Sequence, residues 1–243
     1  MRRQVFRGRR PRFTVLFGTV AIALALAFAT GRGDVEEPAN AADQAAAVEH
    51  GHEDHGTVSP ATHTEAGHEL QDAMRKLWYD HVGWTRLVIL DFIDGSPDLD
   101  SSLERLLQNQ TDIGNAIKPY YGNAAGRQLT KLLKEHINGA VDLLVAAKAG
   151  DEKRVKKASR AWYRNGNEIA DFLNAANPDN WPRAEMRSMM RKHLNQTLRE
   201  ATQHMQGHHK PEVHTYDHIV DHILAMADTL STGIMAQFPE KFE

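Results

Sequence analysis

Three histidines stand in the same apolar setting, at intervals of about 56 residues: His81, His136 and His193. Each follows large apolar side chains by three, four and seven positions, the spacing of one helix face at about 100° per residue. The three phrases are Met74-x-x-Leu77-Trp78-x-x-His81, Leu129-x-x-Leu132-Leu133-x-x-His136 and Met186-x-x-Met189-Met190-x-x-His193. The apolar part is typical of any helix that faces a core. A histidine centred in it is a candidate for chemistry.

Neutral imidazoles that converge in a helical bundle offer nitrogen ligands to first-row transition metals, namely Zn, Cu, Ni or Fe. Glu200 and His222 are candidates to complete such a site: Glu200 shares a face with His193, and His222 borders the apolar stripe of the last helix. The alternatives are a layer of buried histidines that only form hydrogen bonds, and a site for haem or another ligand. A Glu-x-x-His pair of the di-iron kind is missing at the expected places on these helices.

A second group of histidines lies around residues 204–222. His214, His218 and His222 are spaced by four, so they stack along one side of a helix. His214 and His218 can chelate a metal at the surface, or they can simply be part of a solvated face. The other members are His204, His208 and His209, with Asp217 and Asp221 nearby.

Six amphipathic segments of about 22–27 residues position these side chains. Their expected ranges are 70–95, 97–118, 124–149, 152–175, 183–205 and 212–238. Gly95 and Gly150 end two helices, Ser96 and Asp151 are expected to cap the next ones, and residues 119–123 form a breaker. No alternating strand pattern is seen, so the sequence predicts an all-α, up-and-down bundle of three αα-hairpins. The first, third and fifth helices then run parallel, with their histidines at one depth.

The N-terminal third differs in composition. Six arginines precede an apolar run over residues 13–29 that ends in Ala27-Phe28-Ala29, which predicts a signal peptide over residues 1–29 or an uncleaved membrane anchor. Residues 30–66 have few large apolar side chains and predict a disordered linker that can chelate metals loosely through its histidines. Residues 67–243 are the expected helical domain. The chain is therefore expected outside the cytoplasmic membrane, in the extracellular space or the cell envelope.

Composition and missing motifs exclude several classes of function. The net charge of −3 with both signs mixed indicates no nucleic-acid partner, and the absence of cysteine excludes disulfides and thiolate metal sites. A phosphate-binding glycine loop, a nucleophile elbow and a zinc-protease helix motif are all missing. No other partner is indicated, and contact with a membrane is expected only through an uncleaved N-terminal segment.

Several stretches carry a family resemblance: LWYDHVGWTR, LLQNQTDIGNAIKPYYG, LTKLLKEHI, WYRNGNEIADFL, NPDNWP and MADTLSTGIMAQFPEKF. Over about residues 70–243 the chain resembles uncharacterised small helical proteins of Gram-positive bacteria that are often labelled "glycosyltransferase". The resemblance implies a helical fold and carries no catalytic residues. Nucleotide-sugar transferases are typically built on α/β sheets, so the lack of strands argues against that activity.

Two functions follow as hypotheses. The first is an exported helical bundle that binds a transition metal through His81, His136 and His193, with Glu200 and His222 nearby. The second is a non-catalytic module of the cell envelope, whose histidines are structural.

Overall fold

The computed structural model describes residues 64–243 of the 243-residue chain. The predicted signal peptide, and the predicted linker up to residue 63, lie outside the described residues. Within them the structure has six α-helices and no strand, which confirms the all-α prediction. The helices are α1 Glu65–Asp94, α2 Leu99–Ala116, α3 Lys118–Lys148, α4 Glu152–Ala176, α5 Arg183–Met205 and α6 His209–Gln237, followed by the short 3₁₀ helix η3 Pro239–Lys241.

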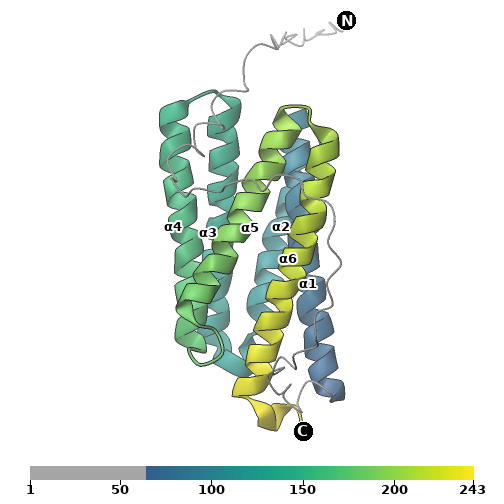
Figure 1. Cartoon of the computed structure of the whole chain (residues 1–243), viewed down its shortest axis with the longest axis vertical. Coiled ribbons are helices and arrows are strands. Elements are labelled where there is room, and N and C mark those ends of the chain that lie inside the picture. Colours follow the sequence, from purple (N-terminus) through teal and green to yellow (C-terminus); the bar gives the residue numbers. More distant parts are fainter. Residues whose placement is uncertain (1–63) are drawn as a thin grey trace, which may run out of the picture.

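The six helices form a closed ring. Each helix packs against its neighbours in sequence, and α1 closes the ring against α6 (Figure 1). The connections are short, so consecutive helices run in opposite directions and α1, α3 and α5 run in the same direction, as the sequence predicted. The C-terminus of α1 and the α3–α4 and α5–α6 turns therefore lie at the same end of the bundle (Figure 1).

Four helix boundaries differ from the sequence expectation, each for a local reason. α1 begins at Glu65, because Thr64 accepts a hydrogen bond from the backbone N–H of Gly67 and caps the helix; the expected linker boundary at residue 66 thus falls in its first turn. α2 begins at Leu99 rather than Pro97, and its cap is Asp98 rather than Ser96. The remaining two differences concern α3 and α6.

The expected breaker before α3 is a kink rather than a loop. Lys118 already starts the helix, and Gly122 interrupts it with φ 81°, a left-handed conformation that glycine adopts without strain. In α6 the helix starts at His209, so Pro211 lies in its first turn. Proline is tolerated there because the first N–H groups of a helix have no intrahelical acceptor.

Two apolar regions fill much of the interior of the ring. Toward the N-terminus of α1, large side chains that include Met74, Trp78, Ile113 and Trp181 surround a cavity of about 10 Å³. Toward the other end, a second apolar cavity of about 40 Å³ is lined by side chains from five helices, including Val88, Leu106 and Leu144. The buried histidines of α1, α3 and α5 lie between these two apolar regions.

α6 also has the length and hydropathy of a membrane span, the one such helix among those described. Of its apolar window, 56% is buried within the bundle. The core-facing residues of this window include Ile219, Ile223, Leu230 and Ile234. Core helices of globular bundles commonly have the length and hydropathy of a membrane span as well, because their apolar stripe is wide.

Candidate metal centre

His81, His136 and His193 meet inside the ring, and we call these three side chains the core layer. All three are buried, and they come from α1, α3 and α5 respectively. The ring centroid of His193 lies 5.6 Å from that of His81 and 6.3 Å from that of His136. The three matching sequence positions therefore do reach one depth of the bundle.

Amide side chains hold two rings of the core layer. His136 donates from Nδ1 to Asn165 Oδ1 at 2.9 Å, since an amide oxygen can only accept, and Nε2 then carries the lone pair. His81 Nδ1 lies 3.3 Å from Gln110 Nε2, which also donates to the carbonyl of Leu106. Because an amide nitrogen can only donate, His81 accepts at Nδ1 and carries its proton on Nε2. Both rings are therefore neutral imidazoles in fixed tautomers.

Burial keeps these rings neutral. Desolvation lowers the pKa of His81 to about 3, with a further contribution from nearby His136. Desolvation likewise lowers the pKa of His136 to about 4, and that of His193 well below its ordinary value. At neutral pH all three rings are therefore neutral, and a metal ion would meet no competition from protons.

Four polar atoms around the core layer have no hydrogen-bond partner among the described residues: His193 Nδ1, Gln110 Oε1, Trp78 Nε1 and Trp162 Nε1. Buried polar groups are paired in the great majority of cases, so such a concentration calls for an explanation. The indoles are close to the imidazoles. Trp78 lies 5.7 Å from His81 edge-on, and Trp162 stacks on His136 at 5.2 Å.

His222 and Glu200 do not join the core layer. His222 donates from Nε2 to the carbonyl of Met189 at 3.0 Å, and desolvation lowers its pKa. Glu200 is seven residues beyond His193, or about 10 Å along α5, so the two share a face but cannot reach one ion at that distance. Glu200 shares a face of α5 with His193, as expected, but its side-chain contacts lie elsewhere.

Glu200 instead belongs to a charged network at the end of the bundle near the α5–α6 turn. Its Oε1 accepts a hydrogen bond from Arg86 Nη1 of α1 at 2.6 Å, and the same guanidinium contacts Glu212 Oε1. Arg86 also lies over the ring of Tyr216, 4.7 Å from its centroid. Desolvation raises the pKa of Glu200 to about 7, although Arg86 opposes the shift.

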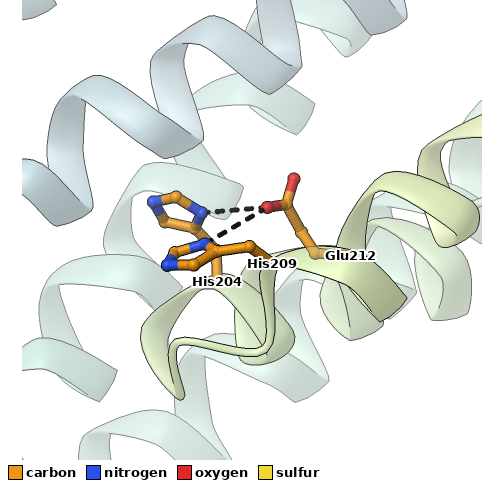
Figure 2. A group of neighbouring side chains, drawn as sticks. All are labelled: His204, His209 and Glu212. Carbon is orange, nitrogen blue, oxygen red and sulfur yellow. Dashed lines mark hydrogen bonds and ion pairs between the residues drawn. The ribbon is translucent and has the colours of Figure 1, made fainter.

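His204, His209 and Glu212 meet in this network, and we call them the hairpin group. One ligand atom from each lies within 4.8 Å of the other two, and no other set of three such side chains does so in residues 64–243. Glu212 Oε2 lies 3.1 Å from His204 Nδ1 and 3.8 Å from His209 Nδ1 (Figure 2). The core layer does not meet this distance as it stands.

Neighbouring charges orient the hairpin group. Asp94 Oδ1 of α1 lies 3.2 Å from His204 Nε2, so both nitrogens of this ring face carboxylate oxygens. A neutral imidazole has one N–H and can satisfy only one of them. If His204 donates to Asp94, the Nδ1 lone pair faces Glu212, and a second proton or a metal cation must lie on that side.

The hairpin group is half open to solvent. The side chains of His204 and Glu212 are 8% and 3% exposed, whereas that of His209 is 68% exposed. A cation there would have two firmly placed ligands, one adjustable ligand and access to water. This is the arrangement of three protein ligands and one open position found in zinc sites that exchange their fourth ligand.

The sequence did contain a signal for the hairpin group. Glu200-x-x-x-His204 precedes Gly207, and His209-x-x-Glu212 follows it, so the turn brings two carboxylate–histidine pairs of helical spacing together. What the sequence could not show is the contribution of α1, because Arg86 and Asp94 reach the turn only when α1 closes the ring against α6.

Comparisons with protein-family models, with curated proteins and with solved structures find no match. The resemblance stated from the sequence therefore stays a prediction, and the functional argument rests on geometry.

Proposed function

We propose that this protein binds a divalent first-row transition metal, of which Zn²⁺ is the best fit, at the hairpin group. One observation carries the proposal: two imidazole nitrogens and one carboxylate oxygen lie within 4.8 Å of one another at the end of the bundle. Two nitrogen ligands and one oxygen ligand suit Zn²⁺, with water in the fourth position.

The surroundings support a metal in two ways. With a metal ion on Nδ1, His204 would donate from Nε2 to Asp94, an outer contact that fixes the tautomer and raises the basicity of a metal-bound histidine. Arg86 contacts Oε1 of Glu212, which leaves Oε2 directed at both histidines. Arg86 therefore orients the carboxylate without occupying its metal-facing oxygen.

We further propose that the metal is handled outside the cytoplasmic membrane, as residues 1–29 indicate. The predicted linker carries four histidines, His50, His52, His55 and His63, in a stretch with several carboxylates. Such a stretch captures metal ions weakly, and the hairpin group would then hold one of them in a defined geometry. No catalytic role is assigned to any residue.

The second candidate function is a structural module of the cell envelope. The observation that favours it is the position of His204 between Asp94 and Glu212, because a second proton on the ring would satisfy both carboxylates without a metal. The two functions differ in what they require of His209. Metal binding needs it as a ligand, whereas a purely structural network gains little from it because its ring is mostly exposed.

Zinc binding to the full chain distinguishes the two functions. The linker histidines must first be silenced, so the parent is the full chain with His50, His52, His55 and His63 changed to Asn, which we call the linker-silent protein. Titration calorimetry should give one Zn²⁺ per linker-silent chain, and His209→Asn should weaken binding about 10–100-fold.

The matched control is the double change His214→Asn and His218→Asn, which removes the exposed pair on α6 whose rings lie 4.6 Å apart. The proposal requires that this control keep the parent affinity. Equal zinc binding by the parent and the His209→Asn variant would leave the structural module as the function.

A further inference from the structure

The ring spacing in the core layer is slightly wider than that of imidazoles that share a metal ion. Nitrogen ligands about 2.0–2.1 Å from an ion place the ring centroids about 5–5.5 Å apart in tetrahedral or trigonal geometry. The observed separations from His193 are 5.6 and 6.3 Å. The nitrogens do not yet converge within 4.8 Å, so the rings must turn about their Cβ–Cγ bonds while the backbones stay in place.

Two of the three rings have a free lone pair. The lone pair of His81 Nδ1 faces Gln110 Nε2 at 3.3 Å, and Gln110 keeps the carbonyl of Leu106 as an acceptor when the His81 ring turns away. His136 uses Nδ1 to donate to Asn165, which leaves Nε2 free to bind an ion and supplies the outer contact typical of a metal-bound histidine. His193 is buried, its ring lies between those of His81 and His136, and its Nδ1 has no partner in the described part of the chain. An unpaired nitrogen at this place is an independent sign of a missing ligand.

The side chains around the core layer indicate the charge of the ion that it can bind. Within residues 64–243, the side chains in contact with the three rings are the amides of Gln110 and Asn165, the indoles of Trp78 and Trp162, and the rings themselves, and none is a carboxylate. A cation here keeps its full charge in an apolar interior. The desolvation cost rises with the square of the charge, so a dication costs about four times as much as a monocation of equal size.

We infer that the core layer is a second metal site, distinct from the hairpin group, and that it binds a monovalent soft cation, copper(I), through His81, His136 and His193. Two or three neutral imidazoles suit this ion, which needs no carboxylate and tolerates low coordination numbers. Apolar cavities on either side, the edge-on indole of Trp78 and the stacked indole of Trp162 exclude the water that would favour a dication. The hairpin group, with the carboxylate of Glu212, keeps Zn²⁺.

The test uses the linker-silent protein and copper(I) under anaerobic, reducing conditions, in competition with a coloured copper(I) chelator. One copper(I) per chain should be retained. His136→Asn, which keeps the donor to Asn165, and His193→Asn should each weaken retention at least tenfold. The paired control, His204→Asn with His209→Asn, should retain copper(I) as the parent does and lose zinc, so the two sites fail or succeed separately.

A measurement without core substitutions keeps the inference testable if those variants do not fold. Silver(I) is a redox-inert probe of the same charge and softness, and histidine ring ¹⁵N resonances of the linker-silent protein report where it binds. The inference requires that the rings of His81, His136 and His193 shift at one equivalent. It is overturned if only the exposed histidines respond to silver(I), if the core variants retain as much copper(I) as the parent, or if Zn²⁺ enters the core layer instead.

Discussion

Acid should destabilise this fold through the core histidines, and His136→Asn isolates the effect of one of them. Asparagine carries its amide N–H near the position of the ring Nδ1–H, so it can still donate to Asn165. It does not titrate. The change removes one buried base and keeps the hydrogen bond, so the pH dependence of the free energy of unfolding reports on the imidazole.

The magnitude follows from the pKa in each state. Burial lowers the pKa of His136 to about 4 in the folded protein, whereas the unfolded chain binds a proton at a pKa of about 6.5. Below pH 6.5 the unfolded state therefore holds more protons, and stability falls as the pH falls toward 4. This linkage costs about 0.2 kcal/mol at pH 7 and about 2 kcal/mol at pH 5.

Urea denaturation at pH 7 and pH 5 measures this difference, with a chelator present to remove metal ions. The free energy of unfolding of His136→Asn, minus that of the parent, should rise by about 2 kcal/mol between pH 7 and pH 5. Contributions from groups present in both proteins, including Glu200, cancel in the subtraction. The exposed control His214→Asn should show no such change.

A shift below about 0.5 kcal/mol, or one of opposite sign, would refute the reasoning, because it would mean that the ring of His136 is solvated or protonated in the folded state. His81 provides a second case with the same sign, since burial lowers its pKa to about 3. Its loss of stability should continue to lower pH than that of His136.

Three further predictions concern packing, charge and export. Gly233→Ala should destabilise the fold by about 2–3 kcal/mol, because a Cβ there would meet Trp181 Nε1 at 2.1 Å; Gly83→Ala, whose Cβ has an ordinary contact at 3.8 Å, should be neutral or stabilising by up to about 1 kcal/mol. Arg86→Met should cost about 3 kcal/mol in urea denaturation at pH 8, because two buried carboxylates lose their shared cation, and saturating zinc should restore part of the loss. N-terminal sequencing of the exported protein should begin near Thr30.

Each of these three predictions can be refuted by a specific result. Equal stability of the two glycine variants would mean that the turn around the buried indole is free to move. An Arg86→Met protein as stable as the parent at pH 8 would mean that the carboxylates are solvated or protonated. An intact Met1 in the membrane fraction would make the N-terminal segment an anchor.

The helices could be predicted because the apolar side chains of each recur with the 3.6-residue period of an α-helix. The histidine positions followed as well, since three parallel helices with centred histidines must place them at similar depth. The kink at Gly122 was not predictable, because a single left-handed glycine interrupts α3 without ending it. The first turn of α6 was missed since Pro211 indicates a break as readily as a helix start.

The candidate metal centre was harder to predict than the fold. Periodicity grouped Glu200 with His193, although a separation of seven residues puts two turns of helix between them. The actual neighbour of Glu200 is Arg86, more than 100 residues earlier in the chain, and this contact depends on how the ring closes. Sequence spacing shows which residues share a helix face. Which charged residues of distant helices come into contact is decided by tertiary packing.

The central claim is that His204, His209 and Glu212 bind one divalent metal ion. The most direct test is anomalous diffraction at the zinc absorption edge from crystals of the linker-silent protein grown with one equivalent of Zn²⁺. The account predicts an anomalous peak about 2.0–2.2 Å from a nitrogen of each histidine and an oxygen of Glu212. A map with no peak at the α5–α6 turn, or with zinc only at His214 and His218, would contradict it.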